Sequence, residues 1–389
     1  MLQEAQRIGG ELVNWRRDLH MHPELGFEET RTAALVAHEL ETMGYRVRSQ
    51  VGRTGVVAEF GGGQPVVAIR ADMDALPVQE ENDVPYASQV PGVMHACGHD
   101  AHVACALGAA RLLREQDFAG TVRLLFQPAE ETEDDEGVSG APRMIQDGAM
   151  EDVSAIIALH VDSSIPAGVI GLVKGPAAAG VDTLYATILG QGGHGSKPEE
   201  TVDPIYIASH VILALYGILA RRVPAHHPAV ISVGSIHGGQ ASNVIPEKVE
   251  LSATIRYTDS ETQKLLHREI EKALGIARAM GGDCDHRISI GCPPMSNDPA
   301  VVELVSRVSS GLLGPDQVQY LEPMMGSEDF CFFTELVPGA MFMLGCKLGD
   351  EERQHHNPHF DIDERCLPIG AAVLAETTLQ LLHREKPVV

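Results

Sequence analysis

A short segment of the chain gathers residue types that bind metals or act as nucleophiles. Met94–His102 holds one cysteine and three histidines within nine residues. Thiolate and imidazole groups at this spacing suit a borderline-soft divalent metal. The alternative is a cysteine nucleophile, Cys97, with His99 as its base. A cysteine hydrolase, however, would not need the further acids and histidines that the chain supplies elsewhere.

Those further candidates occur at three other places: Glu130-Glu131, His160 and His355-His356. Two neighbouring acids allow one carboxylate to bind a metal while the other moves protons, and on an extended backbone they would point to opposite faces. The two late histidines precede Asn-Pro and are therefore expected on a turn. Spacing alone does not select one of them. Together these residues predict a catalytic metal site assembled from distant segments.

The elements that must position these residues are predicted to be strands of an α/β layered domain. Apolar runs that favour strands lead directly into the chemistry-bearing residues at Val66–Arg70, Thr121–Phe126 and Ser154–Leu159. In open α/β sheets, ligands bind outside the carboxyl ends of the strands. Helices expected between and after the strands include Ala101–Glu115 and a closing helix near Ile369–His383, and this alternation indicates the α/β class.

Two further expectations concern local pairing and domain organisation. The run Val56–Phe60, a glycine turn and Val66–Arg70 read as a hairpin. Residues 182–292 then change texture to a β-α-β-β-α-β order, which matches the ferredoxin-like unit. We therefore expect a catalytic metal-binding domain formed by residues 1–181 and 293–389, with residues 182–292 inserted as a second domain.

The inserted domain carries its own candidate residues. His194 lies in the glycine-rich loop Gly190–Ser196, so it is either an exposed residue of a hairpin turn or a lid residue that stabilises an oxyanion. Arg256 falls on the polar face of an alternating strand and could bind a substrate carboxylate, which suits guanidinium geometry.

Composition limits the class of protein. With 389 residues and a formal net charge of −25, the chain would repel nucleic acid. The most apolar stretch, Pro204–Ala220, is shorter than a bilayer span and includes His210, so we expect a buried or interface helix and no membrane partner. The N-terminus lacks the apolar run of a secretory signal, and seven irregularly spaced cysteines do not suit a disulfide framework. A cytoplasmic location is the expectation.

Several segments together resemble the aminoacylase and zinc-carboxypeptidase superfamily of metallo-amidohydrolases. Within it, the chain is most similar to the branch of hippurate hydrolases, N-acyl-amino-acid amidohydrolases and auxin-conjugate hydrolases. The matching segments run through nearly the whole chain in the family's order: His20–Glu28, Arg70–Pro77, His95–Asp100, Gln127–Glu131, Gly192–Gly195, Asn243–Pro246, Gly326–Phe330 and His356–Pro358.

This resemblance implies a site with two divalent metal ions bridged by Cys97. Glu131 and His356 would complete the ligands of one ion, and His99 and His160 those of the other. The ligand chemistry favours zinc, with manganese, cobalt and nickel as further possibilities.

The resemblance also implies how the remaining residues act. Glu130 would be the general base and Asp74 would orient the site from behind, while His194 would stabilise the oxyanion from its own chain or from a partner subunit. Asn243 and Arg256 would hold the substrate's carboxylate. The inserted domain would serve as a lid and as the surface for a homodimer or higher homo-oligomer, through its long apolar helix.

The expected reaction is hydrolysis of the amide bond of a small N-acyl amino acid, which yields a carboxylic acid and a free amino acid. A dipeptidase, or a hydrolase or deaminase of another C–N bond, is the alternative enzyme. A catalytically silent metal- or ligand-binding protein is the alternative of a different class. One departure from relatives is the acidic stretch Thr132–Glu136 in place of a glycine-rich one. It predicts an acidic wall near the substrate that would disfavour acidic acyl-amino acids or favour a cationic group.

Overall fold

The computed structural model describes residues 1–351 and 353–383, which form two compact units. The smaller unit is Pro176–Met295 with Pro323–Glu328, and the larger unit comprises the described residues outside it. The predicted boundaries at 182 and 292 differ from these by a few residues, and the late segment Pro323–Glu328 was not expected in the smaller unit. The function of the smaller unit as a lid remains a prediction.

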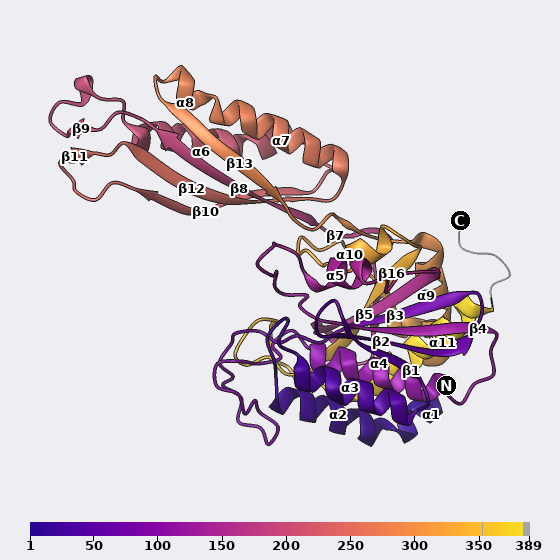
Figure 1. Ribbon diagram of the computed structural model, residues 1–389. Helices are drawn as coiled ribbons and strands as arrows, with labels where there is room; N and C mark the ends of the chain where they lie inside the picture. Colours follow the sequence, from indigo (N-terminus) through magenta and orange to yellow (C-terminus); the bar gives the residue numbers. More distant parts are fainter. Residues whose placement is uncertain (352, 384–389) are drawn as a thin grey trace. The chain divides into compact units, whose positions relative to one another are not determined.

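The larger unit is built on an eight-stranded mixed sheet (Figure 1). In spatial order its strands are β1 (Arg46–Val51), β2 (Gly55–Gly62), β4 (Gly120–Gln127), β3 (Val66–Asp72), β5 (Val153–Pro166), β16 (Gly339–Lys347), β6 (Ile170–Leu172) and β15 (Val318–Tyr320). Strand β3 is buried at every residue and runs parallel to both of its neighbours, β4 and β5. Continuous apolar runs of this kind are typical of parallel strands covered on both faces, and the predicted α/β class is confirmed.

The predicted hairpin of β2 with β3 is wrong, because β4 lies between them. Strand β2 pairs antiparallel with β4, and β3 pairs parallel with the opposite edge of β4. The turn glycines Gly61 and Gly63 do have positive φ angles, so the local turn signal was correct. Such a signal does not determine which strand becomes the neighbour, and the fully buried β3 is instead flanked by parallel strands.

Helices cover the sheet on both faces. The helices of the larger unit are α1 (Leu2–Arg7), α2 (Gly9–Met21), α3 (Thr30–Thr42), α4 (His99–Leu113), α5 (Gly140–Gln146), α9 (Pro299–Leu313), α10 (Cys331–Thr334) and α11 (Leu367–Leu382), with short 3-10 turns at Pro315–Gln317 and Glu364–Cys366. Figure 1 shows α1 to α4 and α11 on one side of the sheet and α5 and α10 on the other. Helices α4 and α11 pack closely, since a Cβ on Gly108 would lie 2.9 Å from the Cβ of Ala371.

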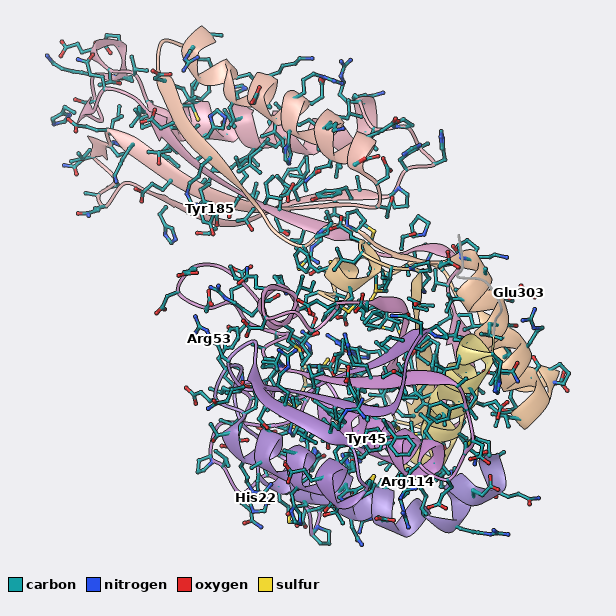
Figure 2. The ribbon with its side chains drawn as sticks, turned by 45° about the vertical axis from the view of Figure 1, so that its right-hand side comes forward. His22, Tyr45, Arg53, Arg114, Tyr185 and Glu303 are labelled. Carbon is teal, nitrogen blue, oxygen red and sulfur yellow. The ribbon has the colours of Figure 1, made fainter. Side chains whose placement is uncertain are left out.

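The first helices are tied to α4 by polar contacts as well as by the core. The Tyr45 hydroxyl donates to the Ala110 carbonyl (3.0 Å), and Arg114 Nε donates to the Met43 carbonyl (2.8 Å). Figure 2 labels Tyr45 and Arg114 on this helical side of the larger unit. These bonds join the segment after α3 to the end of α4, so the helix that begins at the predicted ligand His99 is fixed at its far end.

The smaller unit has a four-stranded antiparallel sheet and the predicted β-α-β-β-α-β order. Its elements are β8 (Gly180–Leu189), α6 (Pro204–Arg221), β10 (Ala229–Gly238), β12 (Lys248–Tyr257), α7 (Ser260–Leu274), α8 (Ile276–Ala279) and β13 (Asp283–Ile290), in the spatial strand order β10-β12-β8-β13. A short pair, β9 (Gly193–His194) with β11 (Val244–Ile245), and a 3-10 turn at Pro198–Glu200 complete it. The two-stranded sheet of β7 (Gly175–Ala178) with β14 (Met295–Asn297) contains two of the points at which the chain passes between the units. This sheet order is that of a ferredoxin-like unit.

Helix α6 is long and apolar enough to cross a membrane by length and composition alone. One side of it, including Ile207, Val211 and Leu215, packs into the core of the smaller unit. A second side leaves apolar side chains exposed, with Tyr206 59% and Leu213 70% accessible. The apolar composition of α6 is therefore only partly explained by packing within its own chain.

Candidate metal centre

The predicted ligand residues come together in the larger unit. One ligand atom from each of Cys97, His99 and His160 lies within 4.8 Å of the others, and the same holds for Cys97, Glu131 and His356. Cys97 belongs to both groups, and its Sγ is 3.5 Å from His160 Nε2. This geometry fits a thiolate shared between two ions. The assignment of these residues as ligands stays a prediction.

Gly98 allows Cys97 and His99 to face the same site. It caps the N-terminus of α4 in the left-handed conformation, with a φ of +90°. A Cβ at this position would lie 2.3 Å from Val161 Cγ2. A side chain is thus excluded by both backbone conformation and space. The helix begins at His99, two residues before the predicted start.

The two acids do not lie on extended backbone as expected. They follow β4 in a bend in which Ala129 has a φ of +43°. Because of this bend both carboxylates turn toward the same place, and oxygens of Glu130 and Glu131 lie within 4.8 Å of each other and of a His99 ring nitrogen. The expectation that the acids point to opposite faces is therefore wrong, and both carboxylates are near the same predicted ligand, His99.

The spatial positions of the two remaining ligand candidates, His160 and His356, could not be predicted from the sequence. His160 lies within β5, which continues to Pro166, so it does not end its strand as predicted. His356 lies on a turn with a φ of +61°, and its Nε2 is 2.9 Å from Glu131 Oε1. His355 points elsewhere, since its Nε2 accepts from the Ser163 amide (3.4 Å). The geometry thus selects His356 from the pair.

Asp74 contacts two of the ligand candidates. Its carbonyl oxygen and Oδ1 lie 2.9 and 3.2 Å from His99 Nδ1, and its Oδ2 accepts from the Glu131 amide (3.0 Å). The other ring nitrogen of His99, Nε2, is buried and makes no hydrogen bond. This nitrogen lies 3.7 Å from Asp72 Oδ2. An imidazole whose other ring nitrogen is fixed by a carboxylate or a carbonyl is typical of metal ligands. The donor set therefore fits divalent metal ions.

Electrostatics favour the ligand forms of these groups. Burial opposes ionisation of Cys97, but nearby His160 and His99 lower the pKa of the thiol to about 7. Hydrogen bonds to Cys97 and Glu131 raise the pKa of His356 to about 10. Burial also opposes ionisation of Glu131, but the hydrogen bond from His356 lowers its pKa to about 2. In the absence of metal, protons on the histidines thus balance the thiolate and the carboxylate.

The other two histidines of the opening segment have supporting positions. His102 Nδ1 lies 2.5 Å from Asp72 Oδ1, and its Nε2 accepts from the Val161 amide (2.9 Å). Both of its nitrogens are therefore occupied. His95 is buried without a hydrogen bond, and burial lowers its pKa to about 4, so it is neutral at pH 7.

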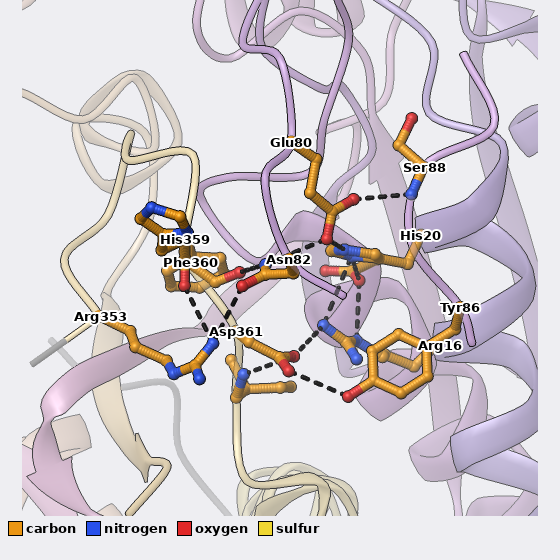
Figure 3. A network of polar contacts seen from close by, with 12 residues as sticks. Arg16, His20, Glu80, Asn82, Tyr86, Ser88, Arg353, His359, Phe360 and Asp361 are labelled. Atoms are coloured by element: carbon orange, nitrogen blue, oxygen red, sulfur yellow. Dashed lines mark hydrogen bonds and ion pairs between the residues drawn. The ribbon is translucent and has the colours of Figure 1, made fainter. Parts of the chain in front are cut away.

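Sequence reasoning missed the buried charge network behind the site (Figure 3). The Arg16 guanidinium is fully buried and binds Asp100 (Nε to Oδ2, 2.9 Å), Asp361 (Nη2 to Oδ1, 3.0 Å) and Glu364 (Nη1 to Oε1, 3.3 Å). Asp100 follows His99, and Asp361 and Glu364 follow the His356 turn. One side chain thus connects two segments that bear ligand candidates. The only sequence signal was the position of Arg16, four residues before the matching segment His20–Glu28 begins.

Two of the four acids in the stretch after the glutamate pair form ion pairs with arginines. Asp134 is buried at its side chain and pairs with Arg53 and Arg143, each at 2.6 Å, and Glu136 also pairs with Arg143 at 2.6 Å. The expected acidic wall is therefore reduced, because two arginines offset these two acids.

The predicted residues of the smaller unit do not all come together. His194 is exposed on β9 and pairs in register with Val244, next to Asn243, whose carbonyl accepts from the Gly195 amide (2.8 Å). Arg256 lies near the far end of β12. It is roughly 25 Å from the start of that strand at Lys248, at about 3.3 Å per residue. There its Nη1 donates to the Met325 carbonyl (3.2 Å). His194 and Asn243 thus form one group, and Arg256 is separate.

An α/β sheet that positions a shared cysteine, histidines and paired acids for metal defines a metal-dependent hydrolase of the amidohydrolase kind. The sequence model of peptidase family M20/M25/M40 matches residues 68–380. IAA-amino acid hydrolase ILR1-like 4 of Arabidopsis thaliana is 39% identical, covering 95% of this chain and 86% of that protein. Thermostable carboxypeptidase 2 of Saccharolobus solfataricus is 40% identical, covering 98% of each. The chain belongs to the M20/M25/M40 peptidase family.

A solved structure agrees with this assignment. The dinuclear metal-binding M20 peptidase YXEP of Bacillus subtilis superposes with a TM-score of 0.84 at 34% identity, covering 97% of this chain and 99% of that one. The resemblance predicted from the motifs and the enzyme class are thereby confirmed.

Proposed function

We propose that the protein hydrolyses the amide bond of N-acyl amino acids with two divalent metal ions, zinc or manganese in the first instance. The observation that carries the proposal is the geometry of Cys97, which is shared by two ligand groups beside Glu130 and Glu131. Two relatives named above are an IAA-amino acid hydrolase and a carboxypeptidase. Both names describe release of an amino acid from an amide bond. That shared chemistry supports this class of substrate.

When bound, the ions would polarise the substrate carbonyl and acidify the attacking water. Glu130 would take the proton from that water and deliver it to the leaving amine nitrogen. Asp74 would keep His99 in one orientation through its bonds to Nδ1. His194 would stabilise the developing oxyanion, and Asn243 and Arg256 would bind the substrate's carboxylate. Asn243 precedes β11, whereas Arg256 lies near the end of β12, and this separation favours their action from different subunits of a homodimer.

The Glu130→Ala variant tests the catalytic part of the proposal. We expect it to retain bound metal but to lose turnover by about 100-fold or more, because a general base contributes on the order of 10²–10⁴-fold. Glu133→Ala, in the same stretch, is the matched control and should keep both properties. Retained turnover in Glu130→Ala would contradict the mechanism, and inactivity of the wild type on every substrate would favour a silent binding protein.

Elemental analysis paired with a substrate panel tests the substrate and the metal. The panel holds acetyl-, benzoyl- and indoleacetyl-amino acids together with dipeptides, each assayed before chelation, after it and after metal add-back. We expect N-acyl amino acids to be cleaved faster than dipeptides and activity to follow metal content.

The seven cysteines all lie in the described residues and are free of disulfides, which supports the proposed cytoplasmic location.

A further inference from the structure

The backbone just before the general base is held in an unusual conformation. Ala129 has a φ of +43°, which L side chains rarely adopt. Its carbonyl accepts from the Gly140 amide (2.9 Å), and a Cβ on Gly140 would lie 1.6 Å from the Pro128 carbonyl oxygen. A non-glycine residue keeps a positive φ only where surrounding contacts hold it there, so neighbouring groups must constrain Ala129.

The main constraint is a buried carboxylate from the N-terminal part of the chain. Glu29 is fully buried, and its Oε1 accepts from the Ala129 amide at 2.7 Å. Its Oε2 accepts from Thr54 Oγ1 at 2.5 Å. Both oxygens are thus engaged, and the Ala129 peptide is bound on its amide and its carbonyl side.

The position of Glu29 in sequence suggests a different task, which another residue performs. Glu29 precedes α3, where a carboxylate commonly caps the first amides of the helix. Those amides are instead bound by Glu24, whose oxygens accept from Arg31 (2.9 Å) and Thr32 (2.8 Å). The Glu29 side chain is therefore free of capping and is directed at the bend.

The same bend is tethered at its other end. Arg53, labelled in Figure 2, pairs with Asp134 at 2.6 Å, and its guanidinium lies 4.7 Å from the centroid of the Phe27 ring. Phe27 and Arg53 also have positive φ angles. The segment from Ala129 to Asp134, which includes both catalytic-site acids, is thus held at each end by residues from Phe27–Thr54.

We propose that Glu29 is a positioning residue that fixes the Ala129 peptide and thereby directs Glu130 and Glu131 toward the metal site. The inference rests on the proposed function for its catalytic part. The metal-binding part of the inference does not depend on the proposed function. Glu131 is placed by the same bend, and its amide donates to Asp74. A loosened bend would displace a base and a ligand together.

The test compares Glu29→Ala, Glu29→Gln and Glu24→Ala in the full chain. We expect Glu29→Ala to weaken Zn²⁺ affinity by about 10-fold, because removal of residues that orient metal ligands commonly has an effect of this size. Competition with a chromophoric chelator measures the affinity. The kcat of Glu29→Ala should fall by about 100-fold with little change in KM. Glu29→Gln keeps an acceptor for Ala129 and a donor for Thr54, and should restore most of both.

Glu24→Ala is the matched control, since it removes a cap from the same region. It should lower the unfolding temperature but leave Zn²⁺ affinity and kcat near the wild-type values. Wild-type Zn²⁺ affinity in Glu29→Ala, or an equal loss in Glu24→Ala, would overturn the inference. If the wild type proves inactive on N-acyl amino acids, the proposed function fails, while the chelator competition still tests the role of Glu29.

Discussion

At the scale of single residues, the setting of Cys97 decides its chemistry. A buried cysteine is most often inert packing, and burial alone would raise its pKa. Here two histidines reverse that effect and bring the pKa to about 7. His356, protonated below about pH 10 without metal, faces the same sulfur. Metal binding must therefore displace protons from this site.

We predict that Zn²⁺ affinity falls as the pH is lowered from 8 to 6. Below the pKa of each ligand the protonated form predominates and competes with the metal, so affinity should drop roughly tenfold per pH unit for each proton displaced. Chelator competition at several pH values measures the slope. Cys97→Ser lacks the titrating thiol and should show a slope smaller by about one proton. A pH-independent affinity would contradict this account.

The residues that could be predicted from sequence are those whose chemistry is rare enough to stand out. Cys97 and His99 were recognisable because thiol and imidazole groups are concentrated in one segment. Arg16 and Glu29 were not, because an arginine or a glutamate in a helical region is ordinary. Their partners, Asp361 and the Ala129 amide, lie 345 and 100 positions away in the sequence. Only the fold shows those contacts.

At the scale of elements, the start of α4 and the bend after β4 place the ligands. The strands and helices could be predicted, because apolar periodicity and length identify them. Their neighbours could not, as the separation of β2 and β3 by β4 illustrates. The direction of the Glu130–Glu131 pair also escaped prediction, because it depends on the positive φ of Ala129 rather than on strand geometry.

Gly98→Ala should damage this arrangement at the start of α4. A Cβ would meet Val161, and the left-handed conformation disfavours any L side chain, so we expect a loss of at least about 2 kcal/mol in the free energy of unfolding. Metal content should fall as well, since Cys97 and His99 flank the site of change. Urea unfolding and elemental analysis measure the two effects.

Gly10→Ala is the control for that substitution. Gly10 lies in α2, and a Cβ there would meet nothing within 4 Å. It should leave metal content unchanged and raise stability slightly, because alanine favours helix over glycine. Equal behaviour of the two variants would refute the role given to Gly98.

At the scale of the whole molecule, each unit has its own hydrophobic core. The smaller unit also exposes apolar residues on α6 and on the edge strand β10, namely Ile205, Tyr206, Leu213, Tyr216 and Ile236. Exposed apolar groups of this kind mark association surfaces. They support the proposed homodimer through this unit.

If the proposed homodimer forms through α6, Leu213→Asp should yield a monomer in analytical ultracentrifugation, where the wild type sediments as a dimer. Leu213 is 70% exposed, so the charge should not alter folding of the chain itself, but its burial between subunits would be unfavourable. If His194 acts from the partner, the monomer will bind metal and lack activity. Leu336→Asp, at a 54% exposed leucine of the larger unit, should stay dimeric. An unchanged sedimentation coefficient for Leu213→Asp would exclude α6 as the contact.

The position of β16 in the sheet has a consequence for biosynthesis. β16 is made after the smaller unit, yet it inserts between β5 and β6, which are made before it. A nascent chain therefore leaves the ribosome with the edge of β5 uncovered while residues 176–295 are translated. The main segment of the smaller unit, Pro176–Met295, can begin to fold during that time, before its late segment Pro323–Glu328 has been made. The turn with His356 emerges later still, so the full set of predicted ligands can come together only after this turn has been translated.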